Sequence, residues 1–127
     1  MPGVPAFILR RLYVKGSLHN RPDGWGFQLK NSLGAGYAKE LKPLTADGEA
    51  VATDQTFFRL DERDVAFSEV SDQNTFALKM NRTILIRAVA DELGAGQHKI
   101  GMGFVVPGFG LLEFDFTDEA AAEPPSE

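Results

Sequence analysis

The carboxylate and imidazole side chains are the groups in this sequence that could carry out acid–base chemistry. Glu113 and Asp115 alternate along one apolar segment, so both would project from the same face of a strand. Two carboxylates facing each other across a cleft can hydrolyse a glycosidic bond. One hypothesis is therefore a small carbohydrate-active or lyase-like enzyme that uses Glu113 and Asp115 with His98. A polar outer surface is the favoured interpretation, because no cleft around these residues is evident from the sequence.

The sequence lacks the spacing patterns of common metal sites and nucleophilic hydrolases. His19 and His98 are the two histidines, they form no H-x-H or H-E-x-x-H pattern, and there is no cysteine. No serine lies in a G-x-S-x-G elbow. We therefore predict that the chain has no catalytic residue, no metal site and no cofactor site of its own.

The glycine-rich stretch DELGAGQHKIGMGFVVPGFG, residues 91–110, could be a phosphate-binding loop or the corner of a β-sandwich. A dinucleotide fingerprint needs G-x-G-x-x-G between a strand and a helix. Here Gly94, Gly96 and Gly101 have the wrong spacing, and the residues that follow alternate with the period of a strand. A corner is favoured, in which Gly94 and Gly96 adopt positive φ and His98 hydrogen-bonds to the backbone.

Length and charge limit the class of protein. The chain of 127 residues fits one domain, and its formal charge of −5 disfavours nucleic acid as a partner. The N-terminal residues do not resemble a signal peptide, and no apolar run is long enough to span a membrane. We expect a cytoplasmic protein that has no membrane partner.

Alternating apolar residues predict about nine strands and no helix. Proline, glycine and aspartate separate these strands, and the pair Asp47-Gly48 is a strong hairpin signal. The run Asp61-Glu62-Arg63-Asp64 is interpreted as a solvated turn. The segments expected to form strands are 7–18, 25–33, 37–44, two short strands within 56–70, 83–90, 99–106 and 111–117.

Short strands at regular spacing predict an all-β fold, an antiparallel β-sandwich of immunoglobulin-like or jelly-roll type. We predict a single domain over residues 1–118 and a flexible acidic tail over residues 119–127. In this fold Trp25 would belong to a buried row with Phe27 and Leu29. The alternative is that Trp25 and Tyr37 stack on a sugar, as in a carbohydrate-binding module.

The segment 101–111 is the predicted interaction surface. Two glycines on one strand face leave that face flat, so a partner chain could approach closely. Apolar residues occupy both faces of the adjoining strands, which indicates either internal packing or an interface. The predicted contact residues are Gly101, Gly103, Phe104, Val105, Phe109 and Leu111.

The segments RRLYVKGSLHN, DGWGFQLKNSLGAG, ADGE and LGAGQHKIGMGFVV resemble small prokaryotic β-sandwich proteins similar to the β subunit of C-glycoside deglycosidases. The resemblance covers residues 8–118. It implies a protein partner, a barrel-fold catalytic α subunit that carries the metal and the acid–base residues, and it assigns no catalytic residue to this chain. A non-catalytic accessory subunit of a carbohydrate-processing complex is therefore the predicted function, and a homo-oligomer remains the alternative assembly.

Overall fold

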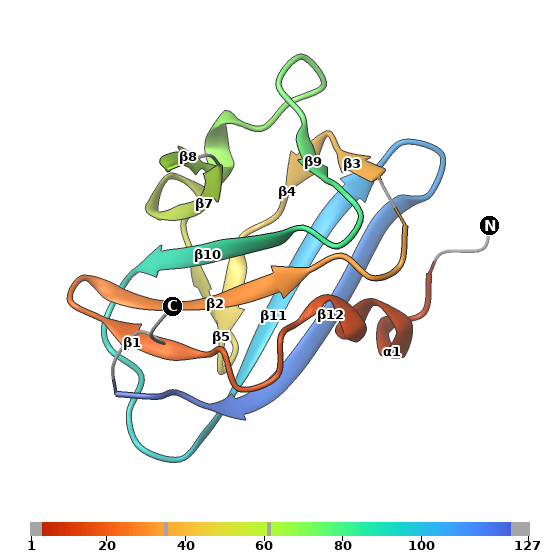
Figure 1. Ribbon diagram of the computed structural model, residues 1–127. Coiled ribbons are helices and arrows are strands. Elements are labelled where there is room, and N and C mark those ends of the chain that lie inside the picture. Colours follow the sequence, from red (N-terminus) through yellow and green to blue (C-terminus); the bar gives the residue numbers. More distant parts are fainter. Residues whose placement is uncertain (1–3, 35, 61, 123–127) are drawn as a thin grey trace.

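The computed structural model describes residues 4–34, 36–60 and 62–122 as antiparallel β-sheets packed together, with one short α-helix at one end (Figure 1). The predicted all-β sandwich-like fold is confirmed. The described residues form twelve strands, more than the nine or so predicted. No helix in this part of the chain is long and apolar enough to cross a membrane.

The first sheet has the strand order β1-β2-β10-β7-β8, and every neighbouring pair is antiparallel. A turn at residues 22–23 joins its first two strands. Trp25, Phe27 and Leu29 all point into the core, as their alternation predicted. The strands are β1 (His19–Arg21), β2 (Gly24–Lys30), β10 (Thr83–Val89), β7 (Thr56–Leu60) and β8 (Arg63–Ala66).

The second sheet has the order β12-β11-β5-β6, and β4 pairs with the far end of β11. Its strands are β12 (Gly110–Glu119), β11 (Gln97–Val106), β5 (Leu44–Ala46), β6 (Glu49–Val51) and β4 (Glu40–Leu41). A separate two-stranded sheet contains β3 (Gly36–Ala38) and β9 (Phe76–Leu78). Short 3-10 helices η2 (Thr53–Gln55) and η3 (Phe67–Glu69) flank β7 and β8.

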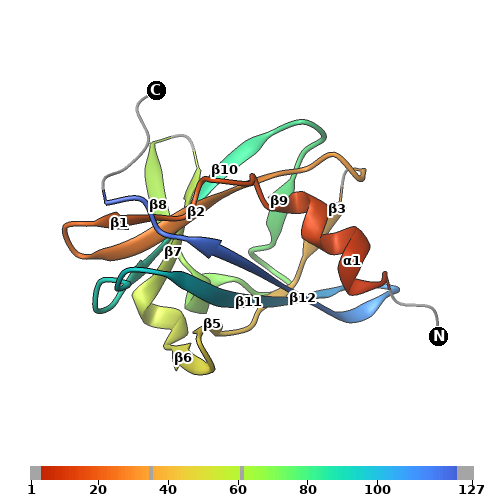
Figure 2. The ribbon, with the colours of Figure 1, turned by 90° about the horizontal axis from the view of Figure 1, so that it is seen from below.

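The core lies between the two large sheets, which Figure 2 shows as two layers. Ile84, Ile86 and Ala88 alternate along β10 and face inward from the first sheet. Leu112, Phe114 and Phe116 do the same from β12 in the second sheet, and they form one buried core cluster with the first set. This two-residue period explains why strand positions were readable from the sequence.

The N-terminal segment differs from the prediction. Instead of a strand over 7–18, it forms the helix α1 (Ala6–Leu9) followed by the 3-10 helix η1 (Arg10–Leu12). Leu9 and Leu12 are both buried, a spacing of three that suits one face of a helix. Tyr13 makes an isolated bridge to the sheet, opposite Leu29 of β2, and the Val14 amide donates to the Gln28 carbonyl at 3.0 Å.

The predicted hairpin at Asp47-Gly48 is confirmed. Asp47 has φ 51° and Gly48 has φ 88°, so both central residues adopt the left-handed region that a type I′ turn requires. The loop before β11 crosses from the first sheet to the second, as expected of a corner. Of its two glycines, Gly96 has a positive φ of 95°, as predicted. Gly94 does not have a positive φ, so the prediction was wrong for that residue.

Tyr13 ties the N-terminal segment to the end of β12. Its hydroxyl donates to Asp118 Oδ2 at 2.7 Å and accepts from the Leu18 amide at 3.1 Å. The ring stacks on Phe116 with centroids 3.6 Å apart. Burial and the hydrogen bond to Asp118 raise the pKa of Tyr13 to about 12, so this phenol stays protonated and keeps donating at physiological pH.

The folded domain extends beyond the predicted boundary at residue 118. Strand β12 continues to Glu119, and Ala121 exchanges backbone hydrogen bonds with the start of β1. The Asn20 amide donates to the Ala121 carbonyl at 2.7 Å, and the Ala121 amide donates to Leu18 at 2.9 Å. The remainder of the predicted tail, 123–127, lies outside the described residues.

Candidate functional site

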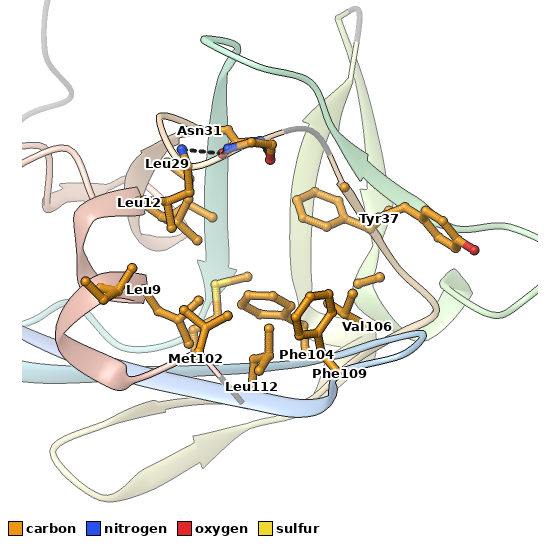
Figure 3. A pocket seen from close by; sticks show the side chains of 17 residues that line it. Leu9, Leu12, Leu29, Asn31, Tyr37, Met102, Phe104, Val106, Phe109 and Leu112 are labelled. Atoms are coloured by element: carbon orange, nitrogen blue, oxygen red, sulfur yellow. Dashed lines mark hydrogen bonds between the residues drawn. The ribbon is translucent and has the colours of Figure 1, made fainter. Parts of the chain in front are cut away.

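An apolar pocket opens at the end of the sandwich where α1 lies (Figure 3). Its volume is about 410 Å³, which is within the range of small-molecule sites in proteins. Residues from α1, η1, β2, β3, β9, β11 and β12 line it together with the connecting loops. These elements are far apart in the sequence, so the pocket exists only when the sheets have packed.

The floor of the pocket comes from the hairpin β11–β12. Met102 and Phe104 lie on the inward face of β11, and Leu112 of β12 pairs with Phe104 in the register. Phe109 closes the turn beside them, as Figure 3 shows. From the sequence, Phe104 was predicted to be a contact residue for a partner, but the sequence could not show that its side chain lines a cavity.

One wall comes from the N-terminal helical segment and β2. Leu9 and Leu12 lie about one helical turn apart and face the cavity together with Leu29 (Figure 3). Prediction of a strand over 7–18 missed this wall. The signal was present in the sequence, because Ile8, Leu9 and Leu12 have the i, i+1, i+4 spacing of one helix face and Pro5 precedes them.

The loop after β2 is fixed by Asn31, a buried side chain in the lining. Asn31 Nδ2 donates to the Gly34 carbonyl at 2.6 Å, and Oδ1 accepts from the amides of Leu33 at 3.0 Å and Gly34 at 3.2 Å. The Asn31 carbonyl also accepts from the Asn81 amide at 2.6 Å. The amide group of Asn31 therefore holds the loop in shape.

The pocket lining that the structure describes contains no Asp, Glu, Lys, Arg or His. Apart from Asn31, its polar side-chain group is the hydroxyl of Tyr37, and Figure 3 shows this hydroxyl pointing away from the cavity. The surface offered to an occupant is therefore almost entirely hydrocarbon and uncharged.

Exposed large hydrophobic side chains line the same pocket or lie on segments beside it: Leu33, Tyr37 and Phe109 line it, and Phe7 and Leu111 each directly precede a lining residue. Those found among the described residues lie on α1, on the loop after β2, on β3, in the β9–β10 turn and at the β11–β12 turn. We call this surface the apolar end. Its members are Phe7, Leu33, Tyr37, Met80, Phe109 and Leu111.

The predicted interaction residues are divided between two faces of the β11–β12 hairpin. Phe104 and Phe109 line the pocket. Val105 and Leu111 pair with each other on the opposite, outer face, where Gly101 also lies. Phe109 and Leu111 are about half exposed, at 47% and 49%, so the strongest exposed anchors in the predicted set are these two neighbours at the turn.

The flat strand face predicted at Gly101 and Gly103 is contacted by side chains of this chain. A Cβ atom at Gly101 would lie 2.5 Å from Thr45 Oγ1 of the neighbouring strand β5. A Cβ atom at Gly103, which is itself buried, would lie 3.2 Å from Glu113 Cγ and 3.5 Å from Lys42 Cβ. Side chains of β5, of β12 and of the segment between β4 and β5 thus make the close approach that these glycines permit.

The two predicted stacking residues are separated in the structure. Trp25 is 1% exposed and stacks near Phe27 inside the core, so its ring offers no face to a sugar and the proposed stacking role does not fit. Core burial, the favoured interpretation of Trp25, is confirmed. Tyr37 is 50% exposed at the rim of the pocket.

His98 is held at the corner by two acceptors. Nδ1 lies 2.6 Å from Asp47 Oδ2, and Nε2 lies 2.7 Å from the Gly94 carbonyl, which confirms the predicted backbone contact. Because both partners are acceptors, the doubly protonated ring satisfies both. The hydrogen bond to Asp47 raises the pKa of His98, and the same bond lowers the pKa of Asp47.

The structure does not bring together the residues of the enzyme hypothesis. Along β11, His98 pairs with Asp118, whereas Asp115 and Glu113 lie opposite Gly101 and Gly103. Asp115 is engaged by Arg10 at 3.5 Å and Lys99 at 3.9 Å. Within the described ranges, no group of three or more His, Cys, Asp or Glu could hold a metal ion.

The remaining candidate groups have structural partners. His19 is buried, burial lowers its pKa, and the neutral ring can donate from Nδ1 to the Ser17 carbonyl at 2.6 Å. In the predicted charged turn, Asp61 lies outside the described residues. Asp64 belongs to β8, where it pairs with Arg59 at 3.2 Å and Arg87 at 2.8 Å. These two partners lower the pKa of Asp64 although burial opposes them.

The fold and the pocket define a small β-sandwich domain with an apolar end. The family model of the hydroxymethylglutaryl-CoA reductase N-terminal domain matches residues 8–121. Because this match covers most of the sequence, the chain belongs to that family. A comparison with curated proteins finds no match.

Proposed function

We propose that this domain is a non-catalytic interaction domain, an accessory unit whose apolar end contacts a catalytic polypeptide. The observation that carries the proposal is the clustering of exposed hydrophobic side chains around one pocket. Exposed apolar side chains gathered in one region are characteristic of protein contact sites rather than of an ordinary solvated surface. Phe109 and Tyr37 are aromatic residues of the kind enriched in such contacts.

Two further observations support an accessory role. The family to which the chain belongs is named for an N-terminal domain of hydroxymethylglutaryl-CoA reductase, that is, for one part of a larger enzyme. The sequence segments similar to the C-glycoside deglycosidase β subunit imply a subunit beside a catalytic partner. In the finer form of the proposal, this partner is a metal-dependent barrel enzyme that processes carbohydrates in the cytoplasm.

The opposing hypothesis, catalysis by this chain, draws no support from the geometry. Asp115 lies on an outer strand face, 3.5 Å from Arg10 and 3.9 Å from Lys99. His98 is occupied at both ring nitrogens. The carbohydrate-binding alternative used Trp25 and Tyr37 as stacking residues, and Trp25 cannot contribute because it is buried.

The test is recovery of a partner with the tagged chain from its native cells, followed by reconstitution from purified components. We expect a catalytic polypeptide in equal amount. Phe109→Ser and Leu111→Ser should each weaken the reconstituted complex about tenfold or more, as for anchors of an interface. Thr117→Ser is the matched control, because Thr117 is exposed on the same strand face as Leu111 but near the other end of β12.

The identity of the partner decides between the forms of the proposal. Recovery of a metal-dependent barrel enzyme would support the carbohydrate-processing form. Recovery of a reductase polypeptide would support the accessory role but contradict a carbohydrate-processing partner. Recovery of this chain alone, with a dimer mass in solution, would contradict the accessory role and favour a homo-oligomer. If Leu111→Ser and Thr117→Ser bind the partner equally well, the apolar end is not the contact surface.

A further inference from the structure

We infer that the apolar pocket is a binding site for an uncharged, mainly hydrocarbon small molecule. This inference goes beyond the proposed accessory function and does not depend on it, because it concerns the interior of the pocket rather than the surrounding surface. It rests on the size of the cavity, on the chemistry of its lining and on the way in which its walls are held.

The size of the cavity suits a small molecule. A dry apolar cavity of about 150 Å³ can hold one benzene molecule. On that scale, the volume of about 410 Å³ would hold roughly two to three such rings or an aliphatic chain of similar volume. A single protein side chain would fill only part of this space.

The lining selects against charge. Its described residues contribute no ionised side chain, Asn31 uses its amide on the loop backbone, and the Tyr37 hydroxyl points away from the cavity. A charged ligand would lose its hydration here and gain no partner, which is a large cost. Water would also find few hydrogen-bond partners, so transfer of an apolar molecule into the pocket is favourable.

The walls of the pocket are held by interactions that do not involve a ligand. The floor belongs to a continuous ladder of β11 and β12, which runs from Gln97 opposite Glu119 to Val106 opposite Gly110. The loop wall is fixed by the hydrogen bonds of Asn31. A site that is preformed in this way loses less free energy in ordering when a ligand binds.

The position of the methionines allows a direct test with 1-octanol as the probe. Met102 lines the pocket, whereas Met80 is exposed at the apolar end and does not line it. In a titration followed by methyl NMR, the Met102 signal should shift with saturation at a dissociation constant on the order of 10–100 µM. The Met80 signal should stay unchanged, because octanol adsorbed on the outer surface is not the proposed interaction.

Octanoate at pH 8 is the matched charged probe, since it differs from 1-octanol only in the head group. It should bind at least about tenfold more weakly, because the lining offers no charge to its carboxylate. Equal binding of octanoate would overturn the inference, and so would a Met102 signal that does not shift or that shifts in parallel with Met80.

Ala38→Phe should block the site. Ala38 is buried in β3 and lines the pocket, so a phenyl group there should occupy the cavity and weaken octanol binding about tenfold or more. Thr117→Ser, on the outer face of β12 and outside the lining, should bind octanol like the unaltered chain. Undiminished binding by a folded Ala38→Phe variant would place the probe elsewhere and overturn the inference. If this variant does not fold, the octanol and octanoate titrations of the unaltered chain still decide the question.

A loss of octanol binding and a loss of partner binding are independent results. A chain that assembles with its partner but fails to bind octanol would contradict only the ligand site. A chain that binds octanol but assembles with nothing would contradict only the accessory function.

Discussion

In the His98–Asp47 pair, a histidine that was a candidate acid–base residue has a structural role. Asp47 Oδ1 accepts from the Lys99 amide at 2.9 Å, while Oδ2 contacts His98. The side chain thus joins the β5–β6 turn to the start of β11. Because Asp47 is exposed, the charge interaction is screened by solvent and salt, and its main effect is on protonation.

Replacement of Asp47 by Asn should lower the pKa of His98 toward its ordinary value near 6.5. The reason is loss of the carboxylate that stabilises the imidazolium. Asn tolerates the positive φ of 51° at this position, so the turn should persist. An NMR titration gives the pKa values, and the signal of His19 is the internal control, because burial rather than Asp47 lowers its pKa.

The same pair sets a pH dependence of stability. The raised pKa of His98 contributes stability that is complete below pH 6.5 and is lost as the pH rises through the folded-state pKa. The lowered pKa of Asp47 contributes stability that is present above pH 3.8 and is lost as the pH falls. The advantage of the unaltered chain over Asp47→Asn should therefore be larger at pH 5.5 than at pH 8.5. An advantage that grows toward pH 8.5 would contradict the assignment.

At the scale of elements, the contact between β2 and β10 depends on a glycine. A Cβ atom at Gly26 would lie 2.7 Å from the carbonyl oxygen of Ile86 on the neighbouring strand. Gly26→Ala should therefore lower the free energy of unfolding by about 1–3 kcal/mol, the usual cost of overpacking. Urea denaturation would measure this loss.

Gly36→Ala is the control for this experiment. Gly36 is also in a strand, but its added Cβ atom would meet nothing within 4 Å, so the variant should be neutral or slightly stabilised through the unfolded state. Similar losses for the two variants would show that strand glycine as such, rather than the approach of β10 to β2, determines the result.

The elements that could be predicted are those whose side chains alternate between the core and another environment. Strand β10 and the inward row of β12 were predicted because one face of each is uniformly apolar. The Asp47-Gly48 turn was predicted because its backbone angles select those residue types. In both cases the determining interaction is local in sequence, or repeats with a fixed period.

The pocket could not be predicted, because it depends on which elements meet at one end of the sandwich. Leu9 was assigned to a strand, since the segment 7–18 is rich in apolar residues and Leu12 and Val14 alternate with their neighbours at the period of a strand. Asn31 had no signal as a lining residue. Its role depends on the hydrogen bonds that it makes to Gly34 and Leu33 within one loop.

At the scale of the whole molecule, the two sheets are joined by packing in the core and by contacts that lie outside the main ladders. The Tyr13 hydroxyl links the N-terminal segment to Asp118 at one such place. The second place is the pairing of Ala121 with Leu18 and Asn20, which attaches the end of β12 in the second sheet to β1 in the first. These contacts join the two sheets near the C-terminal end of β12.

A chain shortened to end at Asp118 should therefore be less stable than one that ends at Ala122. The shorter chain loses both backbone hydrogen bonds of Ala121 and the packing of Ala120 against the core. At about 0.5–1.5 kcal/mol for each hydrogen bond, the free energy of unfolding should fall by roughly 1–3 kcal/mol. The chain that ends at Ala122 keeps these contacts and should unfold at the same urea concentration as the full chain. If both shortened chains match the full chain, the Ala121 pairing does not contribute to closing the sandwich, and the domain ends at residue 118 as the sequence predicted.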